Sequence, residues 1–161
     1  MRSLQSGFVF SELVIAIGVI AILAGFATVN LLGTQHKSEL SGVVDTLLAD
    51  VRQQQTQAMA GAAAGSGGAT SYGIYFEPSR YTLFSGPSFD PGNPENQVIN
   101  LPATAQFTNV TVPNGSVAFA EGSGAFTNFA TGQDSLTVRE ENSGQQKTLR
   151  FNALGVVISI E

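Results

Sequence analysis

The sequence has no cysteine and only one histidine among its 161 residues. Without cysteine the chain can form no disulfide, no thiolate metal site and no cysteine nucleophile, and one histidine cannot build a multi-histidine metal site. Charged residues are also scarce, at 12% against about 25% in ordinary soluble domains. Hydrophobic residues make up 43%. The apolar excess must therefore be concentrated in part of the chain.

Basic residues are scarcer than acidic residues. Seven Lys and Arg stand against twelve Asp and Glu, which gives a net charge of −5. Binding to nucleic acid without regard to its sequence depends on clustered cations that neutralise phosphates. The composition therefore predicts no nucleic-acid partner, and the length predicts one globular unit with accessory segments.

The apolar excess lies in residues 13–32, which contain no charge. Twenty helical residues span roughly 30 Å, the thickness of one hydrocarbon core. A secretory signal peptide is the competing interpretation, but its apolar region has about 7–15 residues and ends at a cleavage site of small residues. Neither feature fits this run. The sequence therefore predicts a transmembrane helix, with Arg2 holding the N-terminus in the cytoplasm.

Glu12 is a carboxylate at the very start of this apolar run. An ionisable group at membrane depth is costly and marks a candidate functional site whose partner has to be named. A second interpretation places Glu12 at the level of the lipid headgroups, where a helix N-terminus favours negative charge. The position alone leaves both interpretations open.

The next segment, residues 35–60, has the pattern of an amphipathic helix. Its apolar residues recur with a period near 3.6, while Glu39, Asp50 and the glutamines Gln53 to Gln55 fall largely on other faces. No proline occurs between Phe8 and Ala60, so we expect the two helical segments to continue as one rod of roughly 80 Å. Small residues then fill positions 61–69, which predicts the helix end and a flexible connection over residues 61–70.

Beyond this connection the hydrophobic period changes to two, which indicates β-strands. Residues 71–76 and 80–84 flank Glu77-Pro78-Ser79 and predict a hairpin. Further strands are predicted at 97–101, 106–112, 116–120, 135–140, 147–151 and 156–160. Residues 71–161 are therefore expected to form an antiparallel β head of two small sheets. The loop at 85–96 is either a contact surface or a passive connector.

No catalytic constellation is visible in the sequence. His36 is the only imidazole, and no nucleophile motif accompanies it, so we expect no enzyme activity and no cofactor. The acidic residues of the predicted loops match no calcium-loop spacing and are expected to be solvated surface charge rather than a metal site. These residues are Asp90, Glu95, Asp134, Glu140 and Glu141.

The front of the chain resembles the class III leader of type IV pilins and pseudopilins. The resemblance rests on a short polar leader ending at Gly7, then Phe8, then Glu12 five positions after the glycine, and then the apolar run. It implies that a prepilin peptidase cuts between Gly7 and Phe8 and N-methylates Phe8. It also implies that Glu12 pairs with the amino group of a neighbouring subunit during assembly. Val29 stands where many major pilins have a helix-breaking proline.

The head is most similar in pattern to H-type pseudopilins of type II secretion and related minor pilins, through the hairpin at 72–84 and the run Phe151-Asn152-Ala153-Leu154-Gly155. This implies an α+β pilin-like fold, with a long N-terminal helix, half membrane-spanning and half amphipathic, packed on the antiparallel β head.

The implied organisation is a prepilin leader at 1–7, a membrane and filament-core helix at 8–34, the amphipathic helix at 35–60, the connection at 61–70 and the head at 71–161. The implied function is a structural subunit of a periplasmic pseudopilus that drives protein secretion, anchored in the inner membrane with its head periplasmic or extracellular. Its partners would be the prepilin peptidase, other pilins or pseudopilins, and inner-membrane lipid before assembly. A minor pilin of a type IV pilus and a single-span surface receptor or adhesin are the alternatives.

Overall fold

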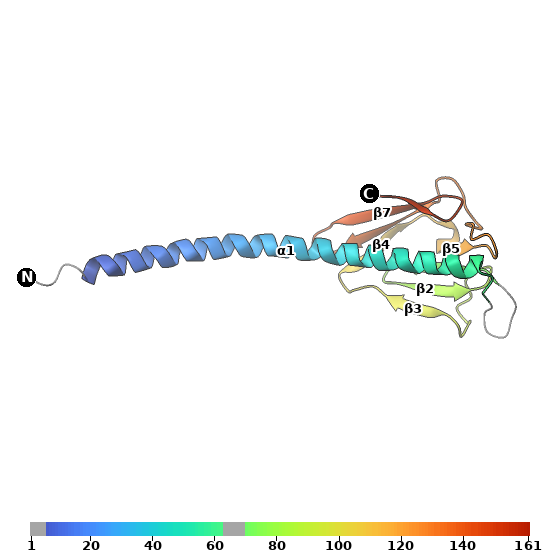
Figure 1. The fold of residues 1–161 in the computed structure, drawn as a ribbon, viewed down its shortest axis with the longest axis horizontal. Coiled ribbons are helices and arrows are strands. Elements are labelled where there is room, and N and C mark those ends of the chain that lie inside the picture. Colours follow the sequence, from blue (N-terminus) through green and yellow to red (C-terminus); the bar gives the residue numbers. More distant parts are fainter. Residues whose placement is uncertain (1–5, 63–69) are drawn as a thin grey trace, which may run out of the picture. The chain divides into compact units, whose positions relative to one another are not determined.

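The computed structural model describes residues 6–62 and 70–161, and within the helix it describes side chains at 10–25 and 39–59. The chain divides into two compact units, residues 1–37 and 38–161. Over the described residues, the elements drawn in Figure 1 are one α-helix, a short 3-10 helix and eight strands. They are α1 (Ser6–Met59), β1 (Tyr72–Glu77), β2 (Arg80–Ser85), β3 (Gln97–Asn100), β4 (Ala105–Val110), η1 (Pro113–Gly115), β5 (Ser116–Phe119), β6 (Ser135–Glu140), β7 (Gln146–Phe151) and β8 (Val157–Ile160).

The strands form two four-stranded antiparallel sheets, ordered β3-β2-β1-β5 and β4-β6-β7-β8. Each predicted strand is confirmed to within two residues at either end. The predicted hairpin is also confirmed, because β1 pairs with β2 up to Glu77 opposite Arg80. The Arg80 guanidinium donates to both carboxylate oxygens of Glu77, at 2.6 and 2.8 Å, and closes the turn.

The last part of α1, residues 39–59, packs against both sheets. In Figure 1 it runs between β2 and β3 of one sheet, drawn below it, and β4 and β7 of the other, drawn above it. Tyr81 of β2 donates to Asp50, and Lys147 of β7 donates to Ser41. The residues that form the shared core are apolar and buried. They include Leu40, Val44, Leu47 and Val51 of α1, Ile74, Leu83, Val117 and Phe119 of the first sheet, and Phe107, Leu136, Val138, Leu149 and Phe151 of the second.

The helix ends at Met59, one residue before its predicted end. Gly61 has a φ of 62°, the left-handed conformation typical of a residue just beyond a helix. Its N–H donates to the carbonyl of Ala58 at 3.2 Å, and the N–H of Ala62 donates to the carbonyl of Gln57 at 3.1 Å. The predicted flexible connection at 61–70 falls mostly on residues 63–69, which lie outside the described residues.

The expected fold class, a pilin-like α+β fold in which a long, half-apolar N-terminal helix packs on a head, is wrong. The unit at 38–161 is mostly β, with eight antiparallel strands in two sheets. The helix side chains that the structure describes fall in two shorter stretches, 10–25 and 39–59, and neither is a long apolar helix. The periodicity of the sequence shows only which face of the helix can be buried. Most of the core against which that face packs comes from the strands.

Within residues 10–25, 39–62 and 70–161, no helix is both long and apolar enough to cross a membrane. The predicted membrane segment, residues 13–32, continues through positions 26–32, whose side chains lie outside the described residues. The leader at 1–7 likewise falls mostly on residues that are not described.

Candidate functional site

The helical stretch at 10–25 presents apolar side chains in every direction around its axis. Leu13, Val14 and Ile15 are consecutive, so they project over more than half of the helix circumference, and each is at least 53% exposed. Phe10, Ile20 and Leu23 extend this surface along the helix. A helix that is apolar all round needs apolar surroundings on all sides, such as lipid or other helices.

Glu12 is the one ionisable residue of this stretch, and its side chain is exposed. It lies at the seventh position of α1, and the first turn of the helix holds no acidic residue. The favourable effect of the helix dipole falls off within the first turn. In this helix, which begins at Ser6, the dipole therefore gives Glu12 little support. The carboxylate lies beside the apolar surface, so a helix that packs against this surface would also contact Glu12.

Gly7 and Phe8, the predicted cleavage and methylation residues, lie in the first turn of α1 by their backbone. The side chain of Phe8 lies outside the described residues, as does that of His36. Gly7, Phe8 and Glu12 therefore belong to one helical segment.

The acidic residues of the loops are not gathered into a metal site. Glu95 accepts from the Ser85 hydroxyl at 3.0 Å, and Asp134 pairs with Arg150 at 3.4 Å. Over the part of the chain that the structure describes, no group of three or more His, Cys, Asp or Glu side chains could hold a metal ion.

Glu140 corrects the expectation that these carboxylates are solvated. Its side chain is fully buried at the end of β6 and accepts from the backbone N–H groups of Asn142 and Ser143, at 3.2 and 2.5 Å. A buried carboxylate is tolerated where such donors satisfy it. It therefore holds the turn between β6 and β7, and sequence hydropathy cannot distinguish it from a solvated charge.

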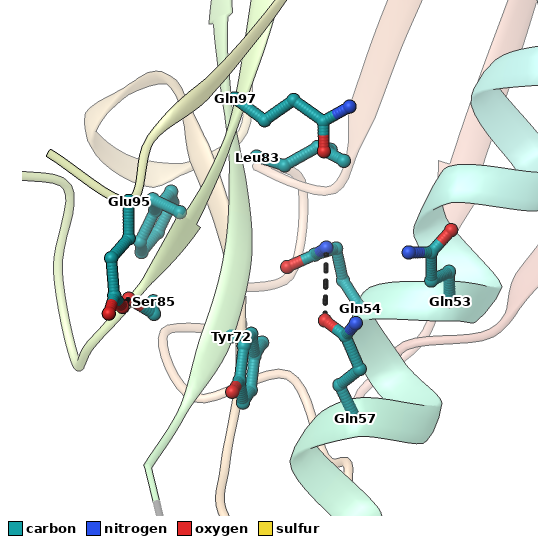
Figure 2. Close-up of a pocket in the computed structure, with 9 residues that line it drawn as sticks. Gln53, Gln54, Gln57, Tyr72, Leu83, Ser85, Glu95 and Gln97 are labelled. Carbon is teal, nitrogen blue, oxygen red and sulfur yellow. Dashed lines mark hydrogen bonds between the residues drawn. The ribbon is translucent and has the colours of Figure 1, made fainter. Parts of the chain in front are cut away.

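A polar pocket of about 190 Å³ lies between α1 and the first sheet and is shown in Figure 2. The prediction that Gln54 lies away from the packed face of the helix is wrong, because its side chain is only 4% exposed. Periodicity assigns glutamine to a solvent face by its polarity alone. The pocket is lined by Gln53, Gln54, Gln57, Tyr72, Leu83, Phe84, Ser85, Glu95 and Gln97.

A second, more apolar groove of about 380 Å³ runs along the same helix on the side of β3. Its walls include Val43, Ile99, Leu101 and Pro102, and Glu39 stands at its edge, where it accepts from the Thr104 hydroxyl at 2.6 Å. Comparison with known proteins finds no family model, no curated protein and no solved structure that matches this chain.

Proposed function

We propose that this chain is the precursor of a pilin-like filament subunit, most similar to the H-type pseudopilins of type II secretion. A prepilin peptidase would cut between Gly7 and Phe8 and methylate the new amino group of Phe8. The proposal is supported by the order of a polar leader, Gly7, Phe8 and Glu12 ahead of an apolar run. It assigns the chain a mechanical role and no catalysis.

The observation that carries the proposal is the exposed apolar surface at 10–25 with Glu12 at its start. Such a surface is stable in lipid before assembly and among like helices afterwards, so one segment serves both states. The unit at 38–161 has a core of its own and would be the part presented in the periplasm or outside the cell.

Glu12 would be the residue that sets the position of one subunit along the next. Cleavage creates a cationic amino group on Phe8, and a carboxylate at low dielectric gains most from a partner of opposite charge. Within residues 10–25 there is no basic side chain, so the partner has to come from elsewhere. An amino group on a neighbouring copy or another pilin meets this requirement.

The experiment that tests the proposal is intact-mass and N-terminal analysis of the full chain, expressed in a bacterial host with and without a prepilin peptidase. The expected product begins at a methylated Phe8 only when the peptidase is present. A chain that still begins at Met1 in the presence of the peptidase would contradict the proposal and favour the single-span receptor. Deletion of the gene in its native host then separates the two filament types, through loss of secretion or loss of piliation.

A further inference from the structure

The buried face of α1 is interrupted by one polar residue. Leu40, Val44, Leu47, Val51 and Ala58 are at most 2% exposed and follow one another at helical spacing. Gln54 occupies the next position of this stripe, between Val51 and Ala58, and is 4% exposed. An apolar side chain there would complete the packing. The amide therefore needs a reason other than the stability of the core.

Half of the Gln54 amide is unsatisfied. Its Nε2 donates to Oε1 of Gln57 at 3.3 Å. Its Oε1 is buried and has no hydrogen-bond partner among the described residues. Buried polar atoms in native structures are nearly always paired, and an exception calls for a strained group or a missing ligand.

The surroundings of Gln54 form a site rather than a random gap. In Figure 2 the amide reaches from α1 toward the strands and lies between Leu83 and Tyr72. The other polar groups come from three separate places in the chain: Gln53 and Gln57 on the helix, Glu95 in the loop after β2, and Gln97 on β3. Tertiary folding thus brings four amides and one carboxylate around a single pocket.

The chemistry of the lining selects the class of ligand. No lysine or arginine lines the pocket, so a phosphate or carboxylate would find no counter-charge. The one charged group, Glu95, would attract a cation, but its carboxylate already accepts from the Ser85 hydroxyl. The amides both donate and accept hydrogen bonds, whereas an ammonium or guanidinium ligand could use only their oxygens. Hydroxyl groups also donate and accept, which matches them to amides. The Tyr72 ring and Leu83 add an apolar wall suited to the C–H face of a ring.

We propose that this pocket binds one sugar unit, with Gln54 Oε1 accepting a hydrogen bond from a hydroxyl. The pocket, about 190 Å³ in volume, has room for one sugar ring. Because Oε1 is covered in the free protein, the proposal requires the amide to turn toward the ligand on binding, at the expense of its 3.3 Å bond to Gln57. This site does not depend on the proposed filament function.

The test is saturation-transfer NMR on the full chain in a detergent that has no sugar headgroup. The probes are glucose, galactose and N-acetylglucosamine, each also as its methyl glycoside, with methylguanidinium and inorganic phosphate as cationic and anionic probes. Binding of a glycoside as tight as that of the free sugar indicates the end of a glycan, and preference for the free sugar indicates a monosaccharide.

Gln54→Leu is the decisive variant, and Gln146→Ala, an exposed amide on β7, is its matched control. We expect Gln54→Leu to weaken sugar binding about tenfold or more while raising the Tm of the sugar-free protein, because it completes the apolar stripe. The control should leave both unchanged. Binding of sugar by Gln54→Leu as tightly as by the wild type would overturn the proposal.

Two further outcomes also overturn it. The first is binding of methylguanidinium or phosphate with no response from any sugar. The second is no response from any probe, which would leave only water in the pocket. If Gln54→Leu fails to fold, Gln97→Ala replaces it, because Gln97 is exposed and its loss should leave the Tm unchanged. Sugar binding by Gln97→Ala as tight as by the wild type would then overturn the proposal.

Discussion

The hydroxyl of Tyr81 donates a hydrogen bond of 2.5 Å to Oδ2 of Asp50. The pair joins β2 to α1 across 31 positions of sequence, and the Tyr81 side chain is 1% exposed. Burial, together with the bond to Asp50, raises the pKa of Tyr81 well above its ordinary value of 10.0. The contribution of this contact to the stability of the packed helix therefore depends on pH in the alkaline range.

Replacing Tyr81 by phenylalanine should lower the free energy of unfolding at neutral pH by about 1.5–3 kcal/mol, because it removes a hydrogen bond to a carboxylate while keeping the ring. A raised pKa in the folded state means that the unfolded chain loses this proton first. The contribution of Tyr81 is therefore complete below a pH of about 10 and declines as the pH rises above it. Urea unfolding of both proteins at neutral and alkaline pH measures this.

The difference in stability between the wild type and Tyr81→Phe should accordingly narrow above a pH of about 10. A difference that stays constant through the alkaline range would show that the Tyr81 hydroxyl ionises as easily in the folded chain as in the unfolded one.

Gly155, in the turn before β8, should tolerate no side chain. Its φ is 76°, and a Cβ atom there would lie 2.6 Å from Cε1 of the buried Phe119. Gly132 has a similar φ of 82° but open space around it. We expect Gly132→Ala to cost about 1–2 kcal/mol from backbone strain alone, and Gly155→Ala to cost a further 1–3 kcal/mol or so from overpacking. Equal losses in thermal unfolding would contradict the proposed clash.

A bulky residue at Gly7 should block removal of the leader, because the peptidase has to fit the backbone just ahead of Phe8. Gly7→Leu is the variant. Gly18→Leu is the control, since a Cβ at Gly18 meets nothing within 4 Å in this chain. Intact mass after co-expression with the peptidase should show uncut Gly7→Leu and normally cut Gly18→Leu. Normal trimming of both variants would remove the basis for the leader assignment.

Glu12→Ala should leave cleavage largely intact but reduce incorporation into filaments, because the amino group of the neighbouring subunit loses its carboxylate. Glu121→Ala removes an exposed carboxylate from the unit at 38–161 and serves as the control. Quantifying each variant in sheared filament fractions, relative to the total, measures incorporation. Incorporation of Glu12→Ala at the level of Glu121→Ala would show that the proposed pairing is absent.

The strands were predictable because alternation with a period of two requires only neighbours in sequence. The helix end was predictable for a similar reason, since Gly61 marks it locally. Gln54 and Glu140 were misplaced because their polarity alone suggests exposure to solvent. The N–H groups beyond β6 satisfy Glu140, while Gln54 lies in the stripe because the helix turn puts it there.

The order in which the strands pair within each sheet likewise could not be predicted from the local sequence pattern. Strand β5 lies beside β1 although the hairpin partner β2, the strand β3 and the strand β4 all come between them in sequence. Hydrogen bonds between strands depend on which edges meet, and several orders of eight short strands satisfy the same alternation. Only the folded chain selects one order.

The sequence by itself determined the positions of the strands and the end of the helix, and it carries the spacing of Gly7, Phe8 and Glu12 on which the proposal rests, because each depends on residues within a few positions of one another. The tertiary structure alone decided the order of the strands within the two sheets, that the Glu140 side chain is buried, and that Gln54 lies with Glu95 and Gln97 around one pocket. These features depend on segments that are distant in sequence. The energy of each contact is set by the groups that folding brings together, and not by the neighbours of a residue along the chain.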